Sequence, residues 1–322
     1  MTIKQIGLMT SGGDSPGMNA GVRAVVRTAL TNGIKVKGIQ RGYAGLLDGD
    51  IHEMDHRDVS GIIQRGGTIL QTARCLEFKE TKGQRLGLRR LNEEDIDALV
   101  VIGGDGSLRG ALALHNMGFP VVGAPGSIDN DIAQTDMSIG VDTALNTILR
   151  ALDSLRDTAA SHERAFLVEV MGRSCGYLAI VGGILGGAEM VCIPESPFEL
   201  EEVSNVVQDA YVKGKNHALI VVAEGAQHNV QSIAEFLRAH ETGFDVRVSI
   251  LGHIQRGGRP SAFDRMLATR LGYAAVHRLM NGTTGVMVGL RGRKIVDIPL
   301  EEATSRQRHV NTEYLNLFKA VS

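Results

Sequence analysis

Three short segments combine glycines with an acidic residue directly after a predicted strand. They are Ser11-Gly12-Gly13-Asp14, Gly103-Gly104-Asp105-Gly106-Ser107 and Pro125-Gly126-Ser127-Ile128-Asp129-Asn130-Asp131. In an open parallel sheet, ligands bind at the carboxyl ends of the strands. Glycine there lets backbone N–H groups point at phosphate oxygens, and a helix that starts just beyond adds its positive end. A single loop of this kind could be an ordinary tight turn, but three that each carry an acid favour a phosphate-binding site.

Phosphoryl transfer needs an acid that holds a metal ion, donors on the transferring group and a base beside the acceptor hydroxyl. Mg²⁺ binds through one or two carboxylates together with substrate phosphates, so Asp105 is a candidate ligand; the alternative is a turn aspartate that bonds its own backbone. Asp129 and Asp131 could act in catalysis or form ordinary Asx turns, and the local sequence leaves both interpretations open. No Walker A motif occurs, and the dinucleotide fingerprint is absent after the first predicted strand.

Short apolar runs separated by helical patterns indicate an α/β fold with buried parallel strands. Apolar stripes at helical spacing predict three helices, and Ser15 is expected to cap the first of them with Pro16 in its first turn. Two runs joined by Arg291-Gly292 predict a hairpin. The expected strands are residues 6–9, 98–102, 121–123, 165–170 and 218–223, the helix faces are 22–30, 145–155 and 267–275, and the hairpin runs are 286–290 and 294–298.

The composition is that of a globular protein large enough for two domains. The chain has 322 residues, of which 43% are hydrophobic and 22% charged; single cores stop growing near roughly 250–300 residues. A net charge of −2 argues against nucleic acid or an anionic membrane as the partner. Cys75, Cys175 and Cys192 are too widely spaced for a disulfide framework or a zinc site, which suits a reducing cytosol. With no signal peptide and no apolar run of transmembrane length, a cytoplasmic location is expected.

Five longer motifs extend the pattern: GGDSPGMNA, GGDGS, PGSIDNDI, VEVMGRSCG and LGHIQRGG occur in this order. In order and spacing they resemble the ATP-dependent 6-phosphofructokinase family over essentially the whole chain. The resemblance implies two Rossmann-like three-layer lobes with mainly parallel sheets. It places an ATP-binding lobe at residues 1–140 plus about 255–305, and a fructose 6-phosphate-binding lobe at 141–254 plus about 306–322. It also implies a homotetramer with active sites at subunit interfaces.

The resemblance assigns the chemistry of phosphoryl transfer from ATP to the 1-hydroxyl of fructose 6-phosphate. Asp129 is the base, the Ser127 hydroxyl lies beside the transferring group, and Arg173 neutralises developing charge. Asp105 holds Mg²⁺. The implied ATP-site residues are Gly13, Tyr43, Arg74, Cys75, Gly106, Ser107 and Gly110. The implied sugar-phosphate residues are Ser127, Asp129, Arg164, Met171, Gly172, Arg173, Glu224, Arg247, His253 and Arg256, with Arg164 and Arg247 reaching in from the neighbouring subunit.

A second basic group resembles the family's effector site for ADP and phosphoenolpyruvate. Without the family context, a polar helix face and a lysine-rich loop would explain it. His56 stands where some members carry an arginine, Ser127 where most carry threonine, and Tyr177 and Val141 where several bacterial members carry Asp and Phe. The implied effector residues are Arg23, Arg27, His56, Arg156, Gly187, Glu189, Lys213, Lys215 and His217.

The nearest alternative is a pyrophosphate-dependent phosphofructokinase. Those enzymes resemble GGDD and PKTIDND, where the added Asp and Lys fill the space of the α-phosphate and nucleoside; this chain has Gly106 and Gly126 there. A dinucleotide-dependent oxidoreductase is disfavoured by the missing fingerprint. A non-catalytic sugar-phosphate sensor is disfavoured because Asp105 and Asp129 are both present.

Overall fold

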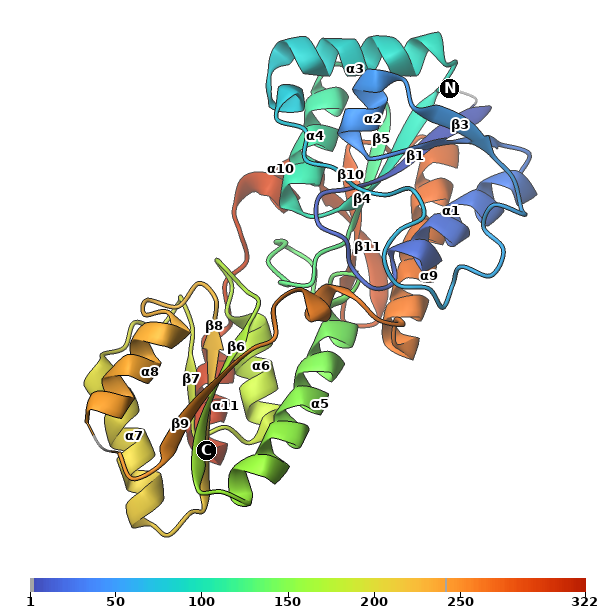
Figure 1. The fold of residues 1–322 in the computed structure, drawn as a ribbon. Helices are drawn as coiled ribbons and strands as arrows, with labels where there is room; N and C mark the ends of the chain where they lie inside the picture. Colours follow the sequence, from blue (N-terminus) through green and yellow to red (C-terminus); the bar gives the residue numbers. More distant parts are fainter. Residues whose placement is uncertain (1–2, 241) are drawn as a thin grey trace. The chain divides into compact units, whose positions relative to one another are not determined.

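The chain folds into two compact units, shown as a ribbon in Figure 1. The computed structural model describes residues 3–240 and 242–322, without the side chain of Thr312. The first unit comprises the residues up to Ile128, Ile132–Thr143 and Arg256–Gln307, and the second comprises Asp129–Asp131, Ala144–Gln255 and Arg308–Ser322. None of the described helices has the length and hydropathy needed to span a bilayer.

The first unit is built on a seven-stranded sheet with the order β11-β10-β5-β4-β1-β2-β3. Its inner strands pair in parallel, and the edge strands β3 and β11 are antiparallel to their neighbours. The strands are β1 Gln5–Ser11, β2 Lys35–Ile39, β3 Ile51–Met54, β4 Ala98–Gly103, β5 Val121–Pro125, β10 Val286–Arg291 and β11 Lys294–Pro299.

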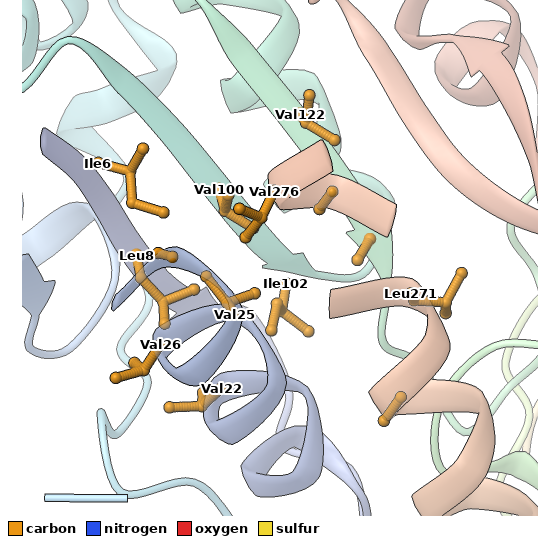
Figure 2. Close-up of a cluster of buried hydrophobic side chains, with 14 of the residues drawn as sticks. Ile6, Leu8, Val22, Val25, Val26, Val100, Ile102, Val122, Leu271 and Val276 are labelled. Carbon is orange, nitrogen blue, oxygen red and sulfur yellow. The ribbon is translucent and has the colours of Figure 1, made fainter. Parts of the chain in front are cut away.

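Both faces of this sheet are covered by helices. Side chains alternate along a strand, so Ile6 and Leu8 of β1 enter one buried cluster and Met9 enters the other. Figure 2 shows the first cluster, where the strands meet α1 and α9. Each fully buried aliphatic side chain contributes about 1.5–3 kcal/mol, which explains the near-continuous apolar strands. The helices are α1 Met18–Thr31 and α9 Ala262–Met280 on one face, and α2 Tyr43–Asp48, α3 Thr81–Glu93, α4 Asp105–Asn116 and α10 Leu300–Ser305 on the other.

The second unit has a four-stranded, fully parallel sheet with the order β7-β8-β6-β9. Helices α7 and α8 bury their apolar residues on one face, and Figure 1 shows α5, α6 and α11 on the other side. The elements are β6 Arg164–Val170, β7 Met190–Cys192, β8 His217–Ala223, β9 Asp245–Ile250, α5 Val141–Ala160 (which begins in the first unit), α6 Tyr177–Gly186, α7 Leu200–Val212, α8 Val230–Ala239 and α11 Thr312–Val321.

The structure confirms the predicted α/β class with mainly parallel sheets. The five expected strands correspond to β1, β4, β5, β6 and β8, and the expected hairpin is the antiparallel pair β10–β11. Strands β2, β3, β7 and β9 were not predicted, because they are short or alternate apolar with polar residues. The expected cap of α1 was wrong. Met18 N donates to Ser15 O in a turn, and Gly17, with φ of 109°, occupies the cap position instead.

A buried carboxylate fixes the start of α5. Asp264, near the start of α9, is fully buried and accepts hydrogen bonds from Gly140 N and Thr143 N, each at 2.8 Å, and from the Thr143 hydroxyl. Ser261 N donates in turn to the Thr143 hydroxyl at 3.0 Å. Burial raises the pKa of Asp264 from 3.8 to about 6, although these hydrogen bonds lower it; Asp142 adds a small upward contribution.

This raised pKa predicts a pH-dependent stability. The folded protein binds the Asp264 proton more tightly than the unfolded chain, so the contribution of Asp264 is largest below its unfolded pKa and is lost as pH rises through about 6. We expect the stability of the wild type relative to Asp264→Asn to fall by about 1 kcal/mol between pH 5 and 7.5. Denaturant unfolding of both proteins across this range measures it. A constant difference would mean that the carboxyl is already ionised at pH 5.

Candidate active site

The carboxyl ends of three neighbouring strands bring the glycine-rich loops together. The register pairs Ser11 of β1 with Gly103 of β4, and Gly103 with Pro125 of β5. Gly126 N donates to Gly103 O at 2.9 Å, so the third loop leaves the sheet directly beside the second. The sequence placed all three loops after strands, and the register shows that they share one edge of the first unit's sheet.

The loops approach one another so closely that side chains are excluded. A Cβ on Gly103 would lie 2.5 Å from Ser11 O and 2.7 Å from the Ser107 Cβ, which is closer than real Cβ contacts. Gly104 lies against the third loop, since its Cβ would be 3.9 Å from that of Ser127. Gly106 differs, because a Cβ there would meet nothing within 4 Å. The edge is therefore packed beneath the loops and open at Gly106.

Asp105 is the first residue of α4, with Gly104 at the cap position. Its side chain is 20% exposed, and its Oδ2 accepts a hydrogen bond from Arg109 Nε at 2.9 Å, one helical turn later. No group of three or more metal-ligating side chains occurs among the residues described. A single carboxylate nevertheless fits Mg²⁺, which takes its other ligands from water and substrate phosphates. Arg109, whose side chain is 54% exposed, has room to move aside.

Arg256 lies on the first glycine loop. Its Nη1 donates to Asp14 O at 3.2 Å, and its guanidinium occupies the space that a side chain on Gly13 would need. A residue assigned to the sugar phosphate and one assigned to the γ-phosphate therefore adjoin within the first unit. A guanidinium beside exposed backbone N–H groups forms a site suited to an anion.

Tyr43 is a buried residue that contacts the second loop. It is 5% exposed, its ring stacks on Phe78 at a centroid distance of 4.0 Å, and its hydroxyl donates to Ser107 O at 2.7 Å. Burial raises its pKa well above the ordinary value. A Cβ on Gly110 would lie 2.6 Å from the Tyr43 ring. Arg74 and Cys75 lie shortly before Phe78 in the chain; Arg74 is exposed and Cys75 is partly buried.

The aspartate segment turns sharply after Ser127. Asn130 is fully buried and has φ of 52°, a left-handed conformation that Asn tolerates better than most residues. Asp129 and Asp131 flank it and are both half-buried. The left-handed residue between the two acids shows that this segment is a turn and not part of a regular strand or helix.

In the second unit, the carboxyl ends of β6 and β8 carry another group of predicted residues. Glu224 N donates to Val170 O at 2.8 Å, and Gly225 N donates to Gly172 O at 3.1 Å. Arg173 Nε lies 3.6 Å from Glu224 Oε1. The Glu224 carboxylate also acts on Glu169, whose pKa is raised first by burial and then by this neighbouring charge.

The 251–256 segment joins this edge through Gln255, which is fully buried. Its Oε1 accepts from Met171 N at 3.2 Å, and its Nε2 donates to Gly252 O at 2.9 Å. His253, in the same short helical turn, is exposed. The Gln255 side-chain amide therefore helps to fix the loop of Met171, Gly172 and Arg173, and no local sequence pattern pointed to this residue.

Arg164 and Arg247 do not join this group within one chain. Arg164 begins β6, and Arg247 pairs in register with Phe166, whereas Arg173 follows the far end of the strand. At about 3.3 Å per residue, the two ends of β6 are roughly 20 Å apart. Both arginines pair with Asp245, at 3.6 and 2.6 Å.

Part of the predicted effector set meets in the second unit. Arg156 donates to Gly186 O and to Gly187 O, the latter at 3.0 Å. Glu189 accepts from Lys215 Nζ at 3.2 Å. The first unit holds Arg23, Arg27 and His56, and the second holds Arg156, Gly187, Glu189, Lys213, Lys215 and His217.

Comparisons with known proteins point to one family. A family model described as Phosphofructokinase matches residues 5–279. The ATP-dependent 6-phosphofructokinase of Clostridium acetobutylicum is 51% identical over 322 residues, covering 99% of this chain and 100% of the relative. A solved phosphofructokinase from Saccharomyces cerevisiae is 39% identical with a TM-score of 0.88, over 98% of this chain and 49% of that one.

A pyrophosphate-dependent phosphofructokinase from Marinobacter aquaeolei has the same fold. Its TM-score is 0.87 over 97% of this chain and 86% of that one, at 24% sequence identity. The shared fold does not discriminate between the two phosphoryl donors, so the choice between them depends on the residues at the glycine-rich edge and on the more similar relatives.

Proposed function

Because this chain belongs to the phosphofructokinase family, we propose that it transfers the γ-phosphoryl group of ATP to the 1-hydroxyl of fructose 6-phosphate. The products are ADP and fructose 1,6-bisphosphate, and the reaction is a step of glycolysis. The observation that carries the choice of donor is the open space at Gly106, directly beside Asp105. An aspartate side chain at this position would occupy space that a nucleotide needs, and Gly106 leaves that space open.

The first unit binds ATP along its glycine-rich edge. Gly13 presents its N–H to the γ-phosphate, and the Ser127 hydroxyl donates to the transferring group. Asp105 holds Mg²⁺, which supplies positive charge to the phosphates and needs no further carboxylate from the chain. The remaining residues proposed to line the nucleotide are Tyr43, Arg74, Cys75, Gly106, Ser107 and Gly110, with Tyr43 acting from its buried position behind the loop.

Asp129 takes the proton from the sugar 1-hydroxyl as its oxygen attacks the γ-phosphorus, and the bond from phosphorus to the ADP oxygen breaks. Arg173 neutralises the charge that develops on the transferring group, and its pairing with Glu224 holds it near the sugar. Arginines suit the 6-phosphate because their planar donors bind phosphate bidentately. The proposed sugar-phosphate residues are Arg164, Met171, Gly172, Glu224, Arg247, His253 and Arg256.

The donor is tested by one assay. With fructose 6-phosphate and Mg²⁺ we expect turnover with ATP and none above background with pyrophosphate. Pyrophosphate-dependent turnover without ATP use would overturn the proposal. The same reaction without Mg²⁺ is expected to lose its activity.

A cytoplasmic location follows from the glycolytic role.

We also infer that the active site is shared between subunits of a homotetramer. Arg164 lies about 20 Å along β6 from the loop of Arg173. Arg247, on β9 in register with Phe166, lies roughly 13 Å from the same end of the sheet, so neither arginine is placed to hold one sugar phosphate together with Arg173 in the same chain. Their contribution to the site of a neighbouring subunit accounts for this separation.

Mixed tetramers test this sharing. Arg247→Ala and Asp129→Ser are each expected to be nearly inactive. Co-refolded at equal amounts, they should recover about a quarter of wild-type activity, because that fraction of sites pairs an intact Asp129 with an intact partner arginine. Mixed tetramers that are no more active than either parent would contradict it.

An effector site for ADP and phosphoenolpyruvate completes the proposal. Arg23 and Arg27 are one turn apart on α1, and the pKa of Arg23 is lowered first by partial burial and then by the Arg27 charge. This crowded positive pair would be relieved by a bound phosphate. His56 is exposed on a loop of the first unit.

A further inference from the structure

One carboxylate in the second unit joins two distant parts of the chain. Glu195 follows β7, and both of its oxygens accept from Gly176 N at 3.0 Å. Its Oε1 also accepts from Val310 N at 3.1 Å. Gly176 allows this approach, since a Cβ there would lie 2.9 Å from Glu195 Oε2. Nothing in the sequence pattern singled out Glu195.

Each of these two parts leads to residues proposed for phosphoryl transfer. Gly176 closes the loop that carries Arg173. Two residues before Val310, Arg308 N donates to Asp131 O at 2.8 Å, so the C-terminal segment lies against the turn that carries Asp129.

Aromatic contacts reinforce the same segment. Tyr314 of α11 meets Tyr177 of α6 edge to face, with ring centroids 5.8 Å apart. The Arg308 guanidinium lies 6.0 Å from the centre of the Tyr177 ring. Burial raises the pKa of the Cys175 thiol to about 12, so this cysteine remains a neutral packing residue within the cluster.

We propose that Glu195 is a positioning residue, which holds the C-terminal segment of residues 308–322 and the Arg173 loop so that both arrange the groups of the transfer step. The inference rests on the proposed function of Asp129 and Arg173. Catalysis depends on such positioning, because a displacement of 1 Å far from the chemistry can lower the rate about 100-fold.

Three variants separate positioning from stability. Glu195→Ala removes the acceptor, Glu195→Gln keeps one oxygen acceptor for Gly176 N and Val310 N, and Glu201→Ala removes an exposed carboxylate from α7. We expect Glu195→Ala to lower kcat about tenfold with less than threefold changes in either KM. Glu195→Gln should recover most of kcat, and Glu201→Ala should match the wild type.

Hydrogen exchange provides a readout that does not depend on activity. In Glu195→Ala, peptides containing residues 129–131 and 308–311 should exchange faster than in the wild type. Unchanged exchange overturns the inference, and so does faster exchange with an unchanged kcat. If the wild type fails the ATP assay, the proposed function fails, while exchange still decides whether Glu195 holds these segments.

A second pair of variants tests the inference in case Glu195→Ala does not fold. Tyr314→Ala removes the edge-to-face contact from a half-exposed position, and Tyr314→Phe keeps the ring. We expect a lower kcat and faster exchange at residues 129–131 only in Tyr314→Ala. Identical behaviour of the two proteins would overturn the role of the C-terminal segment.

Discussion

Replacing Asp129 by Ser or Asn is expected to lower kcat by about 10³-fold or more, while both substrates still bind. General base catalysis alone is worth roughly 10²–10⁴-fold, and loss of correct positioning adds to it. The next residue, Asn130, is fully buried and has a left-handed backbone conformation that defines the turn. We therefore expect the Asp129 side chain to be replaceable without a shift of the loop. Steady-state kinetics and calorimetric binding of fructose 6-phosphate measure the two effects separately.

Two comparisons make the Asp129 result specific. Asp129→Asn preserves the shape of the side chain and removes only its ability to take a proton. Asp153→Ser removes an exposed carboxylate from α5 in the same unit and should leave kcat near the wild-type value. A fall of less than tenfold in both Asp129 variants would mean that another group is the base.

The double variant Gly106→Asp with Gly126→Lys is expected to raise the KM for ATP by at least about 100-fold, which corresponds to about 2.7 kcal/mol of lost binding. A side chain on Gly106 enters open space, so the fold should tolerate it. A Cβ on Gly126 would meet the Met18 Cε at 2.9 Å, and this flexible side-chain end can shift. The lost binding would then reflect occupied nucleotide space.

Titration with ATP and with pyrophosphate, at saturating fructose 6-phosphate, provides the measurement. Gly106→Ala serves as the graded comparison, because a methyl group alone should have a much smaller effect than the charged pair. Normal ATP affinity in a folded double variant would show that the nucleotide does not pass over Gly106, and the argument for the donor would fail.

The sequence was most informative where local pattern and burial agree. Strand β4 is buried along its whole length, so its apolar run was visible without a structure. Strand β2 was not, because exposed and half-buried lysines interrupt it. The cap of α1 was assigned to Ser15 on side-chain preference, whereas the sharp turn required Gly17 with a positive φ.

The residues of the candidate site also fall into two groups, those that a local sequence pattern predicts and those that it does not. The glycine loops and their acids could be found from the sequence, because close approach of the backbone restricts residue type at neighbouring positions. Glu195, Gln255 and Asp264 could not, since a single polar residue carries no local signal of the distant N–H groups that it will meet.

The fold class, the family resemblance and the three glycine-rich loops after strands could all be predicted without a structure, because they depend on short-range patterns of burial and backbone geometry. Which residues share an edge of a sheet could be learned only from the folded chain. Strand register places Ser11, Gly103 and Pro125 side by side, and it places Arg164 at the opposite end of β6 from Arg173. Register and long-range hydrogen bonds depend on contacts between segments far apart in the chain, and no local pattern encodes those contacts.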